Sequence, residues 1–430
     1  MFHMGWFMGT GFGVYNWNQR WSGNVSQDVG NPQLFVDMAT SLERAGFSYM
    51  MLEDSSVLPN VHRGTFESSV KNGGTIRFDP VPLIPFLTAA TKNIGIVATI
   101  STSFYHPFMA ARLFSTLDHV TNGRVGMNLV TSSNKSAMQN YGLKDLIPHD
   151  ERYARANEWV DVVKALWDSW DEDAVLLDEV NGVFADHTKV HTVDFEGKYY
   201  RSRGPLNTIP GPQRHPVICQ AGGSDAGREF GARNADTIIA AVKGVEEMKS
   251  YRDDVSARMI ALGRDPKDVK VLFLISPVLA DSKAEAEEKN AAMLKASAEN
   301  IDAQVAGFSY FTSTDWSKYD YDEPFPDLSK NEGHQSTMND FARSGATIRE
   351  AVTNHRTQES VPLIGTPESI ATEMGEYMDY AGGDGFLIAK PVTRQNITEI
   401  ADGLAPALRK QGLIRPSYEH STFRDNLLAY

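Results

Sequence analysis

Two short motifs in the sequence combine residue types that could hold a phosphate group. In QAGGSDAGREFG, Gly223 and Ser224 stand between an apolar run and a helix-forming run, so Ser224 can cap a helix whose free N–H groups bind an anion. In HDERY, His149 and Tyr153 are four residues apart at the start of another expected helix, with Asp150 as its expected cap. An ordinary capped helix explains the first motif equally well, and the second one better.

A third motif, GRVGMNLVTSSN from Gly123 to Asn134, places an amide inside an apolar strand. Asn128 interrupts the buried pattern, and a row of hydroxyl-bearing residues follows it. Other apolar runs also end in polar residues, namely Glu53-Asp54-Ser55-Ser56, Thr99, Ser101-Thr102-Ser103, Gln220 and Lys390. Hydroxyls, amides and glycines at one rim suit a polar, planar organic cofactor better than a bare metal ion.

The elements that would carry these residues alternate along the whole chain. Eight apolar runs predict strands at His3–Met8, Tyr49–Asp54, Ile94–Thr102, Val125–Thr131, Val217–Gly222, Thr237–Ala241, Val269–Ala280 and Gly385–Ala389. Segments of helical period follow them, and this alternation indicates a parallel sheet. We therefore predict an α/β fold, a (β/α)8 TIM barrel whose site lies at the carboxyl ends of the strands.

Domain organisation follows from the lengths of these elements. We predict a single domain over residues 1–430, with insertion segments at about 171–210 and 302–345 that account for its length beyond a minimal barrel. The first insertion should contain a hairpin near Glu196-Gly197, and the second shows no clean period. A doubly wound sheet is the alternative, but Gly9–Gly13 lacks the G-x-G-x-x-G spacing and does not open a helix.

Composition limits the classes of partner. The net charge of −14, from 41 Lys+Arg against 55 Asp+Glu, disfavours nucleic acid. No run of apolar residues is long enough to span a membrane, and the apolar start reads as a strand and not as a signal peptide. The single cysteine, Cys219, and a His187–His191 pair without the Glu of H-E-x-x-H predict no metal site. We expect a cytoplasmic protein.

Four longer segments carry a resemblance to a known family. They are LDHVTNGRVGMNLVTSSNKSAMQNYG, HDERYARANEWVDVVKALWDSW, EGKYYRSRGPLN and QAGGSDAGREFGARNADTIIAA. In this order they resemble the flavin-dependent monooxygenases of the bacterial luciferase superfamily. The most similar group contains nitrilotriacetate, EDTA and dibenzothiophene-sulfone monooxygenases and a long-chain alkane monooxygenase. The resemblance runs from the first strand to about Ala389, with Met127 standing where the family usually has Trp.

The resemblance implies a function and a set of site residues. A two-component flavin-dependent monooxygenase would take reduced FMN (FMNH2) from an NAD(P)H:flavin reductase. It would then use O2, through a C4a-peroxyflavin, to oxygenate a small organic substrate. It would also form a homo-oligomer, a dimer or a tetramer. By motif, the cofactor-binding residues would be Asp54, Thr99 and Asn128 at the flavin ring and His149, Tyr153, Gly223 and Ser224 at the phosphate.

Other features leave the catalytic details open. No residue is predicted as a dedicated acid or base, and His106 and His334 are the histidines to test for stabilising a peroxide. A small apolar or aromatic substrate is favoured by the aromatics Trp6, Phe7, Phe12, Tyr15, Trp17 and Trp21, although a packed loop would also use them. Two other functions compete with this one, a deazaflavin-dependent oxidoreductase on the same barrel and a non-catalytic flavin-binding protein.

Overall fold

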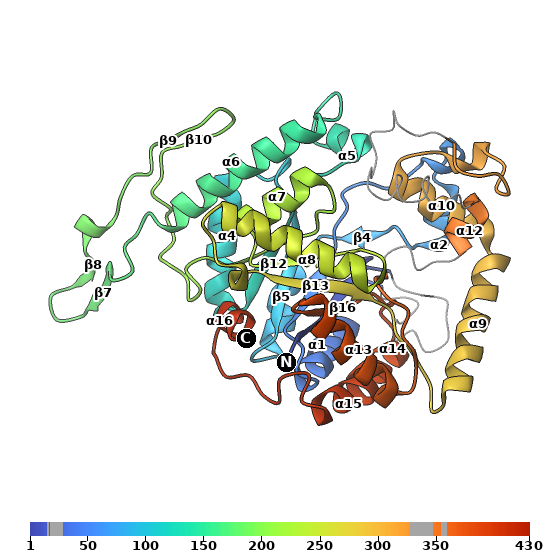
Figure 1. Ribbon diagram of the computed structural model, residues 1–430. Helices are drawn as coiled ribbons and strands as arrows, with labels where there is room; N and C mark the ends of the chain where they lie inside the picture. Colours follow the sequence, from blue (N-terminus) through green and yellow to red (C-terminus); the bar gives the residue numbers. More distant parts are fainter. Residues whose placement is uncertain (15–16, 18–28, 327–346, 354–358) are drawn as a thin grey trace.

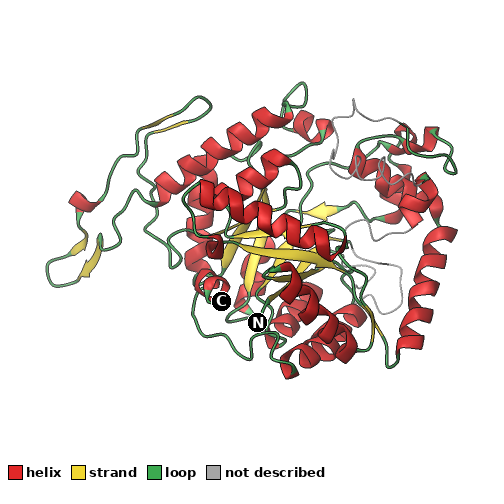
Figure 2. Cartoon of the chain, in the orientation of Figure 1, coloured by secondary structure: helices red, strands yellow, loops and turns green. Residues whose placement is uncertain are grey.

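Eight parallel strands close into a barrel in the computed structural model, which describes residues 1–14, 17, 29–326, 347–353 and 359–430 (Figures 1 and 2). Their order around the barrel is β1, β16, β13, β12, β11, β6, β5 and β3. The bounds are β1 His3–Met8, β3 Tyr49–Leu52, β5 Gly95–Ser101, β6 Val125–Val130, β11 Val217–Gln220, β12 Thr237–Ala240, β13 Lys270–Ile275 and β16 Gly385–Ile388. The predicted (β/α)8 barrel and its eight strands are confirmed.

Alternate residues of the strands fill the barrel, and a short C-terminal helix closes its lower end. Tyr49, Val97 and Cys219 belong to the interior cluster, which α16 (Phe423–Leu428) completes from below. Glycine is required where the Phe423 ring enters, since a Cβ on Gly95 would lie 2.5 Å from that ring. With the lower end plugged, a ligand can reach the interior only from the carboxyl ends of the strands.

The outer layer consists of helices whose apolar faces pack on the barrel, apart from α9, which stands away from it and buries only Ala286 and Ser297 among its own residues (Figure 1). Their bounds are α1 Gln33–Arg44, α3 Ile84–Ala89, α4 Pro107–Val120, α6 His149–Trp167, α7 Asp225–Asn234, α8 Gly244–Ala261, α9 Lys283–Glu299 and α13 Pro367–Ala381. The predicted last helix is interrupted: α14 (Arg394–Thr398) passes through a π-helical turn (Glu399–Leu404) into α15 (Ala405–Lys410). Pro406 explains the interruption, because it lacks an N–H and crowds the carbonyl four residues earlier.

Both predicted insertions depart from the regular βα alternation. Residues 171–203, the arm, project from the barrel on the side of α4 and α6 (Figure 1). The predicted hairpin forms between β9 (Phe195–Glu196) and β10 (Arg201–Ser202), and β7 (Val175–Asp178) pairs with β8 (Val183–Ala185) as a second hairpin. The second insertion is more regular than predicted.

A small module follows α9 where the sequence shows no clean period. It contains α10 (Ile301–Thr312) and α12 (Ile348–Thr353), which share their own cluster of Val305, Trp316, Ile348 and Val352. Phe308, Trp316 and Phe325 pack on one another, whereas Tyr310 donates to Ser55 after β3 at 2.6 Å, and this division obscures a simple amphipathic pattern. The shorter elements are β2 Phe12–Gly13, α2 Glu67–Asn72, β4 Arg77–Phe78, α5 Lys135–Asn140, β14 Val278–Leu279, β15 Ile364–Gly365 and the 3-10 turns His62–Gly64, Val81–Leu83, His187–Lys189, Pro266–Asp268 and Trp316–Lys318.

Within the described part of the chain, no helix combines the length and the apolar composition needed to cross a membrane.

Candidate functional site

The predicted site residues come from one half of the barrel. The strands β3, β5, β6 and β11 are neighbours in the sheet. Thr99 and Asn128 lie on β5 and β6, whereas Asp54 and Gly223 follow the carboxyl ends of β3 and β11. The helix α6, which carries two more of the residues, packs against α7, which follows β11. The site therefore has two parts. We call Thr99 and Asn128, inside the barrel, the strand end. We call the start of α7 on the rim, with His149, Tyr153 and Ser224, the helix end.

The helix end brings together three side chains from two distant motifs. The Ser224 hydroxyl accepts a hydrogen bond from the Gly227 N–H at 3.2 Å and so caps α7, as predicted. The His149 Nε2 lies 3.4 Å from the same Oγ, and the His149 and Tyr153 ring centroids are 5.1 Å apart. Burial raises the pKa of the Tyr153 phenol. Its hydrogen bonds with Ser224 and Thr131 lower this pKa, but by less than burial raises it. The phenol therefore stays neutral and can donate to an anion.

Helix α6 begins differently from the prediction. Pro148 is its N-terminal flanking residue, and the helix starts at His149. Asp150 therefore lies within the first turn and makes no capping hydrogen bond, which corrects the predicted cap. Its carboxylate instead accepts from His149 Nδ1 at 2.9 Å. This contact orients the imidazole so that Nε2 faces Ser224.

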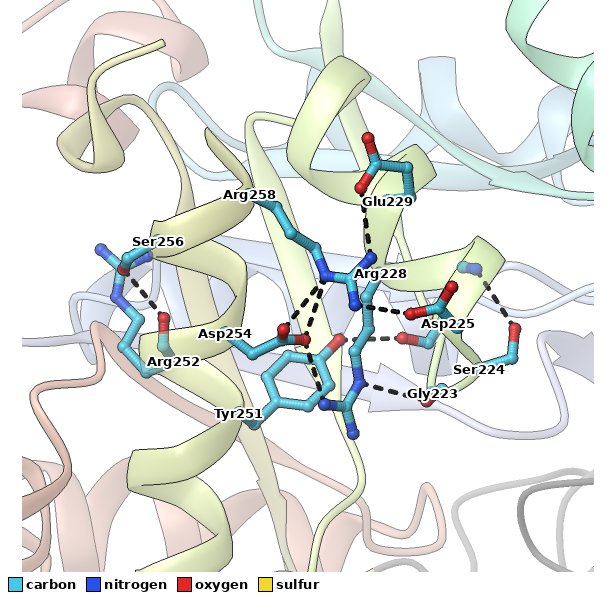
Figure 3. Close-up of polar contacts among 12 residues, drawn as sticks. Gly223, Ser224, Asp225, Arg228, Glu229, Tyr251, Arg252, Asp254, Ser256 and Arg258 are labelled. Atoms are coloured by element: carbon cyan, nitrogen blue, oxygen red, sulfur yellow. Dashed lines mark hydrogen bonds and ion pairs between the residues drawn. The ribbon is translucent and has the colours of Figure 1, made fainter. Parts of the chain in front are cut away.

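A network behind the Gly222–Ser224 loop turns its carbonyls away from the site (Figure 3). The Tyr251 hydroxyl donates to the Gly222 carbonyl at 2.9 Å, and Arg228 Nε donates to the Gly223 carbonyl at 3.2 Å. The Arg228 guanidinium stacks over the Tyr251 ring at 4.6 Å from its centroid. No described residue accepts from the N–H groups at the start of α7 before Gly227, as expected for a helix N-terminus that is open to an anion.

Arg258 of α8 forms an ion pair with Asp225, the acidic residue in the first turn of α7. It donates to Asp225 at 2.6 Å, to Asp254 at 3.1 Å and to Glu229 at 3.2 Å (Figure 3). The Asp225 carboxylate is thus held toward α8 and neutralised, where it would otherwise compete with an anion for the helix N-terminus. Sequence reasoning missed Tyr251 and Arg258, because only the packing of α7 on α8 brings them to the loop, and it gave no role to Arg228, which stands in the motif itself.

Close packing of two glycines sets the position of this loop. A Cβ on Gly222 would lie 2.7 Å from the Gly227 Cα, closer than a side-chain carbon can approach backbone. The absence of a side chain at both positions lets the strand-to-helix turn pass directly against α7. The glycines of the motif therefore position the anion-binding helix end, in addition to making the turn.

The strand end holds a buried polar pair. Asn128 and Thr99 face each other across β6 and β5, and Asn128 Nδ2 donates to Thr99 Oγ1 at 3.0 Å. Both residues are only 4% exposed. The Asn128 Oδ1 has no hydrogen-bond partner among the described residues. An unsatisfied buried acceptor costs about 1–3 kcal/mol, and a ligand that brings an N–H or O–H would recover that cost.

Asp54 lies at the rim one strand away from Thr99. Burial and the nearby Asp79 raise the pKa of its carboxyl to about 6, against the opposing effects of a backbone hydrogen bond at Ser55 and of Arg77. No hydrogen bond or ion pair joins it to the other predicted site residues in the described structure. It can exchange a proton near neutral pH at the edge of the site.

The remaining candidates are placed less favourably for chemistry. His106 is exposed, and its Nδ1 accepts from the Phe108 N–H at 3.3 Å as the cap of α4. His334, Tyr15 and Trp21 lie outside the described residues. Trp6 is fully buried in the outer core and donates to the Lys390 carbonyl at 3.3 Å, so it cannot line a substrate pocket.

The remaining aromatics of the N-terminal segment and Lys390 differ in how much they can contribute to a site. Phe12 packs on Phe35 and Phe78, Trp17 is exposed, and Phe7 is half-buried at the barrel interior, where it can face a substrate. Lys390 is buried and donates to the Pro277 carbonyl at 3.0 Å. The described residues contain no group of three or more His, Cys, Asp or Glu side chains suited to a metal ion.

An open helix N-terminus, a neutral phenol and a buried amide at the carboxyl ends of barrel strands define a (β/α)8-barrel enzyme with a polar ligand site. Residues 8–384 match the family described as luciferase-like monooxygenase. The chain belongs to this family and is a monooxygenase, which confirms the resemblance seen in the sequence.

Individual relatives support the same assignment along most of the chain. The chain is 33% identical to dibenzothiophene-sulfone monooxygenase of Rhodococcus erythropolis, over 94% of its own length and 91% of that protein. It is 32% identical to nitrilotriacetate monooxygenase component A of Aminobacter aminovorans, over 92% and 89%. It also superimposes on a riboflavin lyase solved with modified FMN and riboflavin, with a TM-score of 0.89, 29% identity and coverage of 100% and 96%.

Proposed function

We propose that the chain is the oxygenating component of a two-component system and uses reduced FMN and O2 to oxygenate a small organic substrate. The observation that carries this proposal is the convergence of His149, Tyr153 and Ser224 on one helix N-terminus, which follows the strand next to that of the unsatisfied Asn128 amide. An anion site and a buried acceptor in this combination suit a ligand with a phosphate and a polar ring system.

The residues present fit FMN at both ends. Ser224, Tyr153, His149 and the Gly223 backbone would hold the phosphate, and the Asn128 Oδ1 would accept from an N–H of the ring. Bound reduced FMN would supply the electrons that activate dioxygen. The contribution of the chain is then to bind and orient the cofactor and to exclude water, which requires no dedicated acid or base.

The partner and the substrate class follow from the proposed chemistry. A chain that binds reduced FMN needs a supply of it, and the relative named component A supports a separate NAD(P)H:flavin reductase as the second component. The half-buried Phe7 at the mouth of the barrel interior supports a small apolar or aromatic substrate. Another relative is named for a sulfone of an aromatic heterocycle, so organosulfur compounds are the first substrates to screen.

Anaerobic titration with reduced FMN tests the proposal. We expect Tyr153→Phe and Ser224→Ala each to weaken binding by about 0.5–3 kcal/mol, the value of one hydrogen bond to a charged acceptor, or roughly twofold to 150-fold in Kd. Tyr319→Phe, in the module after α9, and Ser41→Ala, on α1, are matched controls outside the helix end and its network, and both should bind like the native chain. Mixing the loaded protein with oxygenated buffer and candidate substrates then measures turnover.

Two outcomes would contradict the assignment. If the native chain binds a reduced deazaflavin but not reduced FMN, it is an oxidoreductase of the alternative class. If it binds reduced FMN but oxygenates none of a broad panel of apolar and organosulfur compounds, and the reoxidation rate equals that of free flavin, it is a flavin-binding protein without oxygenase activity.

A further inference from the structure

The module after α9 reaches the rim of the barrel through a tyrosine. Tyr310 lies in the last turn of α10, and its hydroxyl donates to Ser55 Oγ at 2.6 Å. Ser55 belongs to the loop that follows β3, directly after Asp54 at the rim of the proposed site. No spacing in the sequence relates residue 310 to this loop, so the role of the tyrosine has to be found in its surroundings.

The same module holds the loop after β3 at a second point. Helix α10 packs against α2 and against the 3-10 turn His62–Gly64 (Figure 1). There the Arg63 N–H donates to Asp315 Oδ1 at 3.1 Å, and the Arg63 guanidinium donates to Asp302 at 2.5 Å. Arg63 has a positive φ of 55°, which a non-glycine residue keeps only where its surroundings impose it. The module therefore has a defined position against the loop, which also fixes the position of Tyr310.

The surroundings of the Tyr310 phenol keep it neutral and able to donate. Burial raises the pKa of this phenol, and Arg77 lowers it by less. The carboxylates of Glu53 and Asp54 act in the same direction as burial. A neutral phenol has one proton to donate, and here the acceptor is the Ser55 hydroxyl. The contact between the module and the loop is therefore present throughout the neutral pH range.

Ser55 connects this phenol to the carboxyl group at the rim. Burial and Asp79 raise the pKa of Asp54 to about 6, and a hydrogen bond from the Ser55 backbone N–H lowers it. That hydrogen bond depends on the orientation of Ser55, which Tyr310 holds through the side chain. A short chain of contacts thus runs from the module to the Asp54 carboxyl.

The charge of Asp54 is not neutralised by its neighbours. The charged and titratable groups that act on it or respond to it are Glu53, Arg77, Asp79, Tyr105 and Tyr310. Arg77 is the cation of this set, and it pairs with Glu53 at 2.6 Å. No described residue forms an ion pair with Asp54. Its ionisation therefore responds to the loss of a single hydrogen bond, and its carboxylate is available to a ligand.

We infer that Tyr310 is a positioning residue for the proposed reaction, which acts through Ser55 to fix the Asp54 carboxyl beside the ring of the bound flavin. The inference rests on the proposed function, because only a bound flavin gives Asp54 this neighbour. An ionised carboxylate can accept from an N–H of the ring, whereas a protonated one is a weaker acceptor. The module after α9 thereby completes the cofactor site from outside the barrel.

Anaerobic binding of reduced riboflavin between pH 5 and pH 8 tests this inference. Riboflavin has no phosphate, so neither the helix end nor phosphate ionisation contributes to the pH profile. We expect the native affinity to rise as the pH passes about 6, and Tyr310→Phe to move this rise to higher pH, because Asp54 loses the support of Ser55. At pH 6 the affinity of Tyr310→Phe should be roughly two- to tenfold lower. Ionisation of the flavin itself is common to all variants.

Three further variants separate positioning from packing. Ser55→Ala removes the acceptor of the Tyr310 hydroxyl and should reproduce the shift of the profile. Tyr319→Phe is the matched control, since this tyrosine of the same module packs on Trp316, and it should keep the native profile. In Asp54→Asn the rise at pH 6 should disappear, and adding Tyr310→Phe should then change the affinity no further.

The outcomes distinguish this inference from the proposed function. A native chain that binds neither reduced FMN nor reduced riboflavin would overturn the proposed function. Native binding with an unshifted profile in Tyr310→Phe, or an effect of Tyr310→Phe that persists in Asp54→Asn, would overturn the inference alone, because Tyr310 would then act through packing. Thermal melting gives a measure without flavin. The pH at which the gain from Asp54→Asn levels off should be higher in the Tyr310→Phe background.

Discussion

At the strand end of the site, Asn128 and Thr99 belong to neighbouring strands whose register fixes their positions, and both are nearly inaccessible. At the helix end, His149, Tyr153 and Ser224 are carried by two helices on the rim and are supported by a network of charged residues. The strand end offers one unsatisfied atom in a rigid frame, whereas the helix end offers several donors whose positions depend on packing. Substitutions should therefore affect the two ends differently.

A substitution that pushes the Gly222 loop away from α7 should have the largest effect on stability and on cofactor affinity. In Gly222→Ala the new methyl group must displace the α7 backbone at Gly227, because neither chain segment can rotate away. We expect the free energy of unfolding to fall by about 1–3 kcal/mol, the usual cost of overpacking, and the affinity for reduced FMN to fall by roughly tenfold to 150-fold. Chemical denaturation and anaerobic titration measure the two quantities.

The matched control for this variant is Gly307→Ala on α10. A Cβ there meets nothing within 4 Å, so neither the free energy of unfolding nor the affinity should fall. If Gly222→Ala bound reduced FMN like the native chain, the position of the loop against α7 would not matter for the site.

At the strand end, stability and binding should separate. Asn128→Leu with Thr99→Val replaces both partners of the buried hydrogen bond by apolar groups of similar shape, and it also removes the unsatisfied Oδ1. Such a replacement is close to neutral or stabilising, so we expect a free energy of unfolding within about 1 kcal/mol of the native value or above it. Affinity for reduced FMN should fall by about 1–3 kcal/mol.

This result would show that the polar pair serves a ligand and not the fold. A loss of more than about 2 kcal/mol in the free energy of unfolding would instead identify the pair as structural. Unchanged affinity would remove Asn128 from the proposed cofactor site.

Loss of the ion pair between Arg258 and Asp225 should have a smaller effect on cofactor affinity. Arg258→Gln frees the Asp225 carboxylate beside the N-terminus of α7, where it competes with a bound phosphate. We expect reduced FMN to bind roughly two- to fivefold more weakly at low salt, the scale of one charge beside a helix end, with a smaller difference at high salt. Adding Asp225→Asn should recover the affinity, and failure to do so would mean that Arg258 acts through packing.

The sequence was informative where a feature is local. The eight strands follow from apolar runs of the right length, and each of the two anion-binding motifs contains its own turn and cap signals. The predicted cap at Asp150 was wrong because Pro148 takes the flanking position and the helix starts at His149, two residues earlier than expected. The alternation of β1 could also have shown that Trp6 and Phe7 face opposite sides, which leaves only one of them for the site.

Features that depend on tertiary packing could not be predicted in this way. Tyr251 and Arg258 reach the loop only because α7 packs against α8, and no spacing in the sequence relates them to Ser224. The unsatisfied state of the Asn128 Oδ1 likewise depends on which neighbour takes the Nδ2 hydrogen bond. The sequence therefore contained the residues of both ends of the proposed site but not the network that supports the helix end.

The smallest effect should come from Asp54, which lies at the rim beside the strand end, on the side away from the helix end. Its pKa is raised to about 6, chiefly by burial, so between the ordinary value for an aspartate and pH 6 the folded chain binds more protons than the unfolded chain. The contribution of this group to stability is therefore present at low pH and is lost as the pH rises through about 6. Asp54→Asn removes that dependence.

We expect Asp54→Asn to melt at a higher temperature than the native chain at pH 8 and at a similar temperature at pH 4. The gain should stay below about 1 kcal/mol, because the half-exposed carboxyl is partly screened by solvent. Thermal melting across this pH range measures the difference, with Asp402→Asn on the exposed outer surface as the control. If Asp54→Asn instead melted at a lower temperature at pH 8, the ionised carboxylate would have a stabilising partner at the rim, and the proposed site would carry a fixed negative charge beside the strand end.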